Sequence, residues 1–313
     1  MNIHSNAVPE SSLNSQPAAP PMSPTRPLYW SVRRELWENR SIYIAPLAAA
    51  GVYMFGFLLS LAWLAHRSQR LFPGHQESPL IELAMPYAHA GMLLTFVAFL
   101  VGIFYSLDAL HGERRDRSIL FWKSMPVSDL TTVLSKASIP LLVLPIIVFA
   151  LTVVLQVALR LLTTISLLAS HGDVAQEWSL PLFQMQVGLL YSLIVIALWH
   201  APIYCWFLLV SGWARRATFL WAVLPPLVLA AVEYIAFHTS YLGLLLQDRL
   251  FGFTYKAFDL VDKNGVPIDA HFIPLSQLAP GRFLSSPSLW VGLIFAALFL
   301  FAAVRLRRYQ GPI

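Results

Sequence analysis

Cysteine is almost absent from this chain of 313 residues, since Cys205 is the only one. A disulfide within the chain is therefore excluded, and so is a metal site built from cysteines. Charged residues are also scarce, at 12% of the chain, against about 25% in soluble domains. A chain with so few charges and 57% hydrophobic residues cannot cover its surface with polar groups, so most of that surface must face lipid.

The common nucleotide and zinc motifs are missing too. The chain has no G-x-x-x-x-G-K-S/T motif and no Gly-Lys pair, so we expect no ATP site of its own. The H-E-x-x-H pattern of helical zinc sites does not occur either. The net charge of +5 falls in short clusters between apolar runs, which is typical of membrane topology and argues against nucleic-acid binding.

Six apolar runs are long enough to cross a bilayer, which takes about 20 residues in a helix. The sequence therefore predicts an all-α membrane protein with spans at 42–66, 86–110, 139–168, 187–213, 217–238 and 289–304. The third run is long enough to tilt or protrude. The last is the shortest, and either 285–288 or 305–309 is expected to extend it.

Lys and Arg are shared unevenly between the two sides of the membrane. With the N-terminus in the cytoplasm, the cytoplasmic segments carry fourteen of them and the outer segments six. The positive-inside rule therefore places both termini in the cytoplasm. We expect a multi-pass protein of the inner (plasma) membrane.

The N-terminal segment is predicted to have two parts. Residues 1–26 are rich in Pro, Ser, Asn and Ala, which favours a disordered cytoplasmic tail, and they lack the pattern of a signal peptide. Residues 27–313 are expected to form a single transmembrane domain. It would begin at 27–40 with an amphipathic helix of Trp, Tyr and Leu against Arg and Glu, lying in the membrane interface. The alternative is a solvated lead-in to the first span.

The longest outer segment, 239–287, connects spans five and six and is rich in aromatic residues. A loop this long and apolar is expected to be structured and to pack on the outer ends of the spans. Residues 241–250 fit a short amphipathic helix, and Asn264-Gly265 is a turn signal.

A charged insert at 113–128 separates the second and third spans. Its pattern predicts a short helix at 115–124, which Pro126 ends. Ser128 is a natural N-cap for the next helix, which continues into the third span. The insert therefore reads as a helix lying across the cytoplasmic face of the membrane.

This helix is expected to present Ile119, Phe121 and Trp122 among basic residues. Exposed aromatic residues beside Arg are typical of a docking surface. The alternative is that Phe121 and Trp122 anchor in the lipid headgroups, where Trp is also common. Periodicity alone favours neither interpretation.

Residues 113–136 resemble the first cytoplasmic loop of ABC transporter permeases of the type-2 (drug and polysaccharide exporter-like) class. That family's pattern is an acidic residue after the second span, a short coupling helix, a Pro-Val/Ile-Ser step and a Ser/Gly-Lys before the third span. The matching positions here are Glu113, 118–124, Met125-Pro126-Val127-Ser128 and Ser135-Lys136. Arg117 stands where the family often has Gly. The order of spans, the N-terminal helix and the long last outer loop extend the resemblance to most of the chain.

The resemblance implies a transport subunit and not an enzyme, with the cargo expected to be exported. Such permeases pair with a second permease protomer, as homo- or heterodimers, and each protomer takes a cytoplasmic ABC ATPase subunit that binds ATP and Mg. No cofactor is implied for this chain itself. The coupling helix sits in a cleft of the ATPase and carries its motion to the spans. The residues implied in this coupling are Glu113, Arg117, Ile119, Phe121, Trp122 and Pro126.

Four polar side chains at membrane depth are further site candidates, because such groups are costly in lipid: Gln156, Arg160, His200 and Glu233. Arg160 and Glu233 are expected at similar depth, where an ion pair or snorkelling by Arg160 is favoured over substrate contact. Gln156 lies one helical turn before Arg160. For His200, a hydrogen-bonded core histidine is the favoured interpretation.

Two other functions fit parts of this pattern. An ion-coupled secondary transporter would show inverted repeats and a central acidic residue, and neither is clear in the sequence. An intramembrane metallopeptidase using His200, Glu233 and His238 would need ligands paired on one helix face, whereas His200 is predicted to lie deeper than the other two.

Overall fold

The computed structural model describes residues 25–67, 79–124, 127–169, 174–259, 275–309 and 311. Most of the N-terminal tail, the turn signal at Asn264-Gly265 and Pro126 lie outside the described residues. The described part is helical throughout, with one isolated antiparallel bridge between Phe258 and Leu278. The all-α prediction is therefore confirmed for this part of the chain.

Six helical segments are long and apolar enough to cross a membrane, in agreement with the six predicted runs. Five contain one long helix each: α2 (Ser41–Arg67), α3 (Pro79–Asp108), α9 (Leu182–Trp213), α10 (Thr218–Phe237) and α14 (Pro287–Tyr309). The last helix extends through Tyr309, so the short sixth run is lengthened at its C-terminal side, and by two residues before Leu289.

The third segment is built from three consecutive elements, α6 (Asp129–Ser138), η2 (Ile139–Val143) and α7 (Leu144–Ala169). The side chain of Ser128 caps α6 as predicted, accepting a hydrogen bond from the Thr131 backbone N–H at 3.1 Å. The single π turn η2 contains Pro140, which has no N–H to donate to a regular ladder. This long segment therefore changes from an α-helix to a π turn directly after α6 and returns to an α-helix at Leu144.

The shorter helices gather at the two ends of the molecule. Helix α1 (Thr25–Glu38) precedes the first span, and α4 (His111–Arg115) and α5 (Ser118–Ser124) connect the second span to the third. Helix α8 (Val174–Trp178) precedes the fourth span. The described parts of the loop between spans five and six form α11 (Tyr241–Phe251), α12 (Phe253–Ala257), η3 (Leu275–Gln277) and α13 (Pro280–Ser285).

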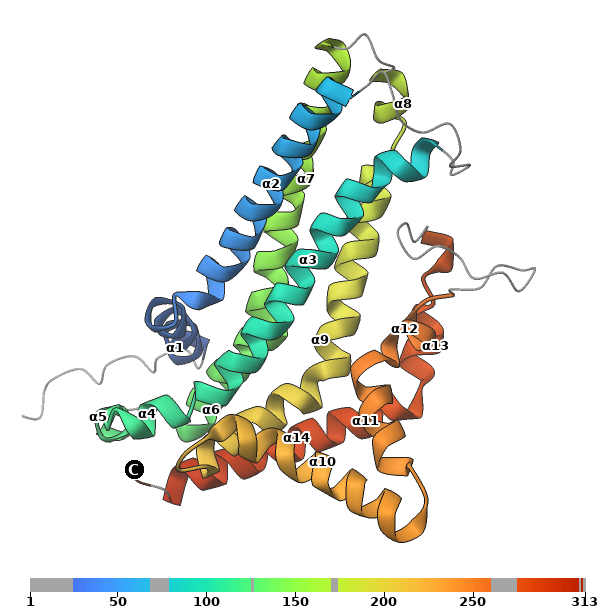
Figure 1. The fold of residues 1–313 in the computed structure, drawn as a ribbon. Helices are drawn as coiled ribbons and strands as arrows, with labels where there is room; N and C mark the ends of the chain where they lie inside the picture. Colours follow the sequence, from blue (N-terminus) through green and yellow to red (C-terminus); the bar gives the residue numbers. More distant parts are fainter. Residues whose placement is uncertain are drawn as a thin grey trace, which may run out of the picture.

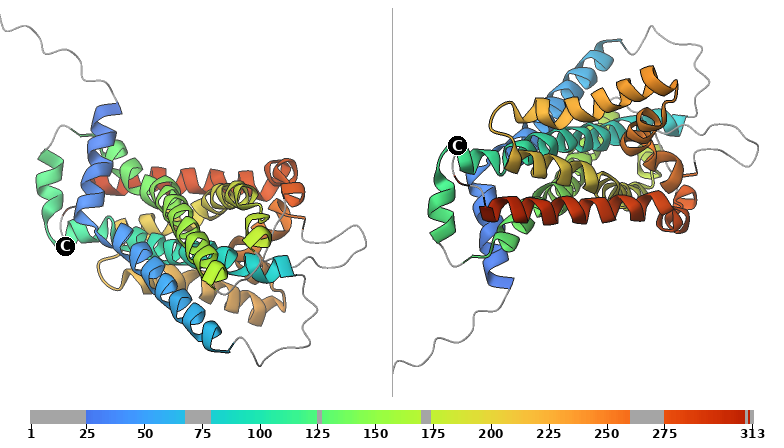
Figure 2. Two further views of the ribbon diagram at one scale, coloured as in Figure 1. Left: turned by 90° about the horizontal axis from the view of Figure 1, so that it is seen from above. Right: turned by 90° about the horizontal axis from the view of Figure 1, so that it is seen from below.

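The long helices converge at one end and diverge at the other (Figure 1). The C-terminal end of α14 lies near α1, α4 and α5 at the converging end, which we call the junction end, and Figure 2 shows the same grouping from above and below. At the far end, α2, α3, α7 and α8 form one group, while α10 to α14 form another.

Helix α9 is the central element of the bundle. It packs against α3, α7 and α14, and its side chains are the most buried among the spans. The main apolar core lies between α2, α3, α7 and α9, where Leu94, Val148 and Leu159 are fully buried. Helices α2 and α10 bury few of their apolar side chains within the bundle, as expected for lipid-facing helices.

Candidate functional site

A buried cluster of charged side chains joins four elements at the junction end. We call it the ionic junction. Helix α1 supplies two members, α4 one, α6 two and α14 one: Arg34, Glu35, Glu113, Asp129, Lys136 and Arg307. Three cations and three anions balance, which is how proteins tolerate charge removed from water.

Glu113 is the centre of the ionic junction. Its Oε1 accepts from Arg34 at 2.9 Å and lies 3.1 Å from the Lys136 ammonium. Its Oε2 accepts from the Arg307 guanidinium, whose Nε also donates to Asp129 at 3.2 Å. One carboxylate therefore connects α1, α4, α6 and α14.

Glu35 is the second buried anion. Lys136 donates to its Oε1 at 2.9 Å, and the Tyr105 hydroxyl at the end of α3 donates to its Oε2 at 2.8 Å. The Glu35 side chain is 0% exposed and that of Lys136 is 3% exposed. Helix α1 is thus held to the bundle by a buried ion pair.

The guanidinium of Arg34 lies at the edge of the junction. Burial by itself would lower the pKa of Arg34, but the surrounding carboxylates, chiefly Glu35, raise that pKa above its ordinary value. The group therefore stays charged. Its other side faces Trp122, with Cζ 3.8 Å from the ring centroid, a cation–π distance.

Helix α5 turns one apolar side chain inward and two outward. Ile119 is 2% exposed and belongs to the interior, whereas Leu120 and Phe121 are 58% and 59% exposed. Trp122 is half-buried between Phe121, which it meets edge-on, and Arg34. The exposed apolar surface of α5 is therefore Leu120 and Phe121 beside Trp122.

Two of the predicted coupling residues are buried and are not presented at the surface. Glu113 is 7% exposed because its carboxylate is used by the junction, and Ile119 packs inward. The expectation that α5 presents Ile119 at the surface is therefore wrong, while the role of both residues in coupling stays a prediction. Phe121 is exposed as expected, Arg117 is exposed, and Pro126 lies outside the described residues.

Arg117 adopts a left-handed backbone conformation with φ of 59°. This region is costly for residues with a Cβ and is favoured by Gly. The residue lies between α4 and α5, where the chain must turn sharply. The position that often holds Gly in the family pattern is therefore one whose geometry suits Gly.

The loop is also tied to the neighbouring helix ends. The Arg114 guanidinium donates to the backbone oxygens of Gly212 at 2.6 Å and Ala214 at 3.3 Å, where α9 ends. Lys123 of α5 donates to the backbone oxygen of Arg308 at 3.5 Å. The connection between spans two and three is thus held by spans four and six.

The predicted approach of Arg160 to Glu233 is wrong. Arg160 donates to the backbone oxygen of Glu177 in α8 at 3.2 Å and lies over the Trp178 ring. Glu233 accepts from the backbone N–H groups of Tyr241 and Leu242, both at 2.8 Å. Each side chain therefore stabilises the short helix nearest to it.

The other two polar candidates have protein partners. The rings of His200 and Phe253 meet edge-on, and the two nitrogens of His200 lie 2.9 Å and 3.3 Å from the backbone oxygens of Ile196 and Leu250. This confirms the interpretation of a hydrogen-bonded core histidine. Gln156 donates to the backbone oxygen of Tyr87 at 2.9 Å.

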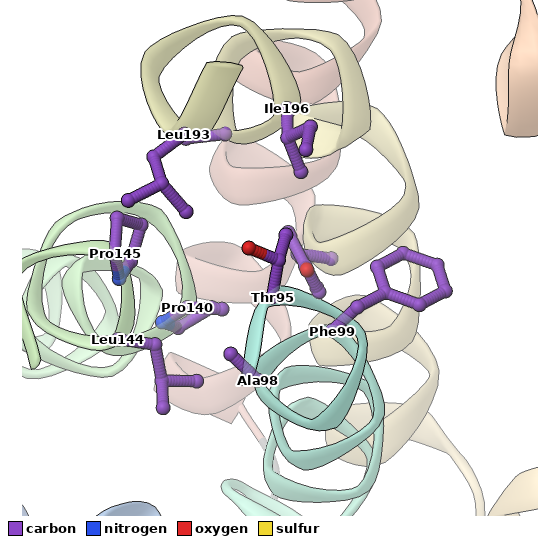
Figure 3. A pocket seen from close by; sticks show the side chains of 10 residues that line it. Thr95, Ala98, Phe99, Pro140, Leu144, Pro145, Leu193 and Ile196 are labelled. Carbon is purple, nitrogen blue, oxygen red and sulfur yellow. The ribbon is translucent and has the colours of Figure 1, made fainter. Parts of the chain in front are cut away.

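A small cavity of about 20 Å³ lies between α3, the π turn and α9. Its walls are mostly apolar (Figure 3): Thr95, Ala98, Phe99, Pro140, Leu144, Pro145, Leu193, Ile196, Ala197 and Tyr204. This is room for about one water molecule. The cavity in this conformation is too small to hold a cargo molecule.

Sequence reasoning missed most of the ionic junction. Arg307 entered only as a positive charge that sets the topology, Arg34 and Glu35 as members of an amphipathic pattern, and Lys136 as part of the Ser-Lys step of the family pattern. One pattern in the sequence could have indicated the junction: acidic residues occur among the basic ones at the helix ends that are predicted to lie on the cytoplasmic side of the membrane. That signal does not reveal which acid meets which base.

Comparison with known proteins found no match to this chain. No protein-family model, no curated protein and no solved structure matches this chain. Among the described residues, no group of three His, Cys, Asp or Glu side chains is placed to hold a metal ion.

Proposed function

We propose that this chain is the membrane-spanning permease subunit of an ABC transporter, exporting its cargo across the inner membrane. A separate cytoplasmic ATPase subunit would bind ATP and Mg, and a second permease protomer would complete the pathway. Both chain termini and the junction end would face the cytoplasm. The resemblance of residues 113–136 to the type-2 permease loop supports this proposal, together with the geometry around α5.

The observation that carries the proposal is an exposed apolar surface on α5, a helix whose inner side contacts the ionic junction. Leu120 and Phe121 face outward on α5, while Trp122 lies against Arg34. Arg34 in turn binds Glu113, which also holds α6 and α14. A push on α5 would pass from Trp122 to Arg34 and from there to Glu113, whose carboxylate also contacts α6 and α14.

A mobile loop would not have this property. Packed side chains and hydrogen-bond networks between a docking surface and the spans can carry motion from one to the other. In this chain Arg114 of α4, which directly precedes α5, donates to the end of α9, and Lys123 of α5 donates to the end of α14. This arrangement suits a coupling helix better than a passive headgroup anchor.

Copurification tests the proposal. The full chain, expressed in its native host and extracted in mild detergent, is expected to copurify with a nucleotide-binding ATPase at one ATPase per permease chain. Transport by the reconstituted chain in the absence of any ATPase and of ATP would contradict the proposal.

Phe121→Asp is expected to abolish that association. The substitution places a charge on the apolar surface that the ATPase would cover, and since Phe121 is 59% exposed the fold should not change. ATPase recovery and the melting temperature are measured together. Tyr255→Asp, at a residue 74% exposed on α12 at the far end, is the matched control and should retain the ATPase. Equal ATPase recovery with both variants would rule out α5 as the contact.

A further inference from the structure

A second buried polar cluster lies at the far end of the bundle, around α8. The Tyr87 hydroxyl of α3 donates to Glu177 Oε1, and Gln156 of α7 donates to the Tyr87 backbone oxygen at 2.9 Å. Gln186 of α9 donates to Gln156 Oε1. Arg160 donates to the Glu177 backbone oxygen at 3.2 Å. These five side chains from four elements form what we call the α8 cluster.

Three polar atoms of the α8 cluster have no hydrogen-bond partner among the residues that the structure describes. Two are acceptors, Glu177 Oε2 and Gln186 Oε1, and one is a donor, Arg160 Nε. Glu177 is 0% exposed, so water at the surface does not reach its carboxylate. A buried carboxylate oxygen without a donor is costly, which indicates that something else supplies one.

The two charged side chains of the α8 cluster, Arg160 and Glu177, do not form an ion pair with each other. Arg160 and Glu177 are close enough for a backbone hydrogen bond, yet the guanidinium does not pair with the carboxylate. Instead the guanidinium lies over Trp178, with Cζ 4.4 Å from the ring centroid. The α8 cluster therefore contains a cation and an anion that are not paired, each with one atom that lacks a hydrogen-bond partner among the described residues.

We propose that the α8 cluster binds a compact zwitterionic group, with an ammonium on Glu177 Oε2 and an oxyanion on Arg160 Nε. Gln186 Oε1 supplies a further acceptor in the same cluster. A free aminoalkyl phosphate and a phosphatidylethanolamine headgroup both carry this chemistry. The inference concerns this chain alone and does not depend on an ATPase partner.

The test uses the full chain purified in detergent and two phospholipid probes with identical acyl chains. Phosphatidylethanolamine has ammonium N–H donors, whereas phosphatidylcholine has the same net charge and none. Native mass spectrometry is expected to show roughly tenfold tighter binding of phosphatidylethanolamine, the size of effect that one charge-assisted hydrogen bond gives. Equal binding of the two lipids, as for a cluster filled by water only, would overturn the proposal.

Competition with free phosphoethanolamine distinguishes the two sources of the group. Displacement of the lipid shows that the headgroup chemistry alone is recognised, and a free solute is then a sufficient ligand. Preference for phosphatidylethanolamine without displacement shows that the acyl chains contribute and that the ligand is a lipid. Each of these outcomes supports the proposal, because each depends on the ammonium donors.

Two variants connect the preference to the cluster. Glu177→Gln removes the negative charge that holds the ammonium and is expected to reduce the preference for phosphatidylethanolamine roughly tenfold. Arg160→Lys removes the Nε–H donor to the phosphate, which both lipids carry, and is expected to weaken the binding of both roughly tenfold. Arg160 is only partly buried, so its variant decides the matter if Glu177→Gln does not fold. Asp259→Asn, at an exposed ion pair with Arg282, is the control and should keep the preference. Unchanged binding of phosphatidylethanolamine by a folded Arg160→Lys protein would contradict the assignment.

Discussion

Lys136 is the side chain on which the ionic junction depends most at the residue scale. Its ammonium is shared by the carboxylates of Glu35 and Glu113 at 2.9 Å and 3.1 Å, and it is almost fully buried. A buried ion pair contributes little net stability compared with apolar packing, but the removal of one partner leaves an uncompensated charge. Glu113 depends on its partners in the same way, so Glu113→Ala tests stability before it tests coupling.

Lys136→Met is expected to lower the free energy of unfolding by about 3–5 kcal/mol, because two carboxylates lose their buried partner. Chemical denaturation in detergent measures this loss. Arg115→Met is the control, since Arg115 forms exposed ion pairs with Asp108 and Asp116. Pairs of that kind contribute about 0–1 kcal/mol. A loss for Lys136→Met no larger than the control's would show that the junction is hydrated.

At the scale of elements, Gly102 of α3 lies against Tyr204 of α9 and Pro140 of the π turn. A Cβ added there would lie 2.9 Å from the ring of Tyr204 and 3.3 Å from the ring of Pro140 in the π turn. Tyr204 is 5% exposed and cannot move away. The absent side chain at Gly102 thus lets α3, α9 and the π turn meet in one layer. Gly56 of α2, by contrast, has nothing within 4 Å of an added Cβ.

Gly102→Ala is therefore expected to destabilise the protein by about 1–3 kcal/mol through overpacking. Gly56→Ala adds the same methyl group at an open position, and its higher helix propensity should leave stability unchanged or raise it by up to about 1 kcal/mol. Thermal melts of the two variants in one detergent make the comparison. Similar melting temperatures for both would mean that α3 and α9 are more loosely packed.

At the scale of the whole molecule, the ionic junction brings distant parts of the chain together. Arg34 lies near the start of the described chain and Arg307 near its end, and Glu113 contacts both. The helices diverge from this point (Figure 1). The junction is therefore placed to hold α1, α4, α6 and α14 together at the end from which the long helices diverge.

Arg307→Gln and Glu113→Gln are expected to be non-additive. Residues that share one buried network couple by about 0.5–3 kcal/mol, so the double variant should lose less stability than the two single losses together. The exposed pair Arg282 and Asp259 is the control cycle and should couple by no more than about 1 kcal/mol. Unfolding free energies of the four proteins in each cycle give both values. Additive losses in the first cycle would show that α14 is not held by Glu113.

Much of the architecture could be predicted because the bilayer imposes strong rules. Long apolar runs must be helical, since lipid offers no partner for backbone N–H and C=O groups. The six spans, the N-cap at Ser128 and the core position of His200 follow from local patterns of this kind. The face of α5 was only partly predicted, because a spacing of three residues does not say whether Ile119 points in or out.

The sequence by itself determined the class of this protein, since composition and run length fix how many helices are long and apolar enough to cross a membrane. Only the tertiary structure decided which charges meet. Arg160 and Glu233 have the right signs and similar predicted depth, yet each binds the backbone near its own short helix. Glu113 looks like a surface acid in the sequence, yet it is buried among Arg34, Lys136 and Arg307. Ion pairing depends on distances of a few ångströms between residues far apart in the chain, and helix packing alone sets those distances.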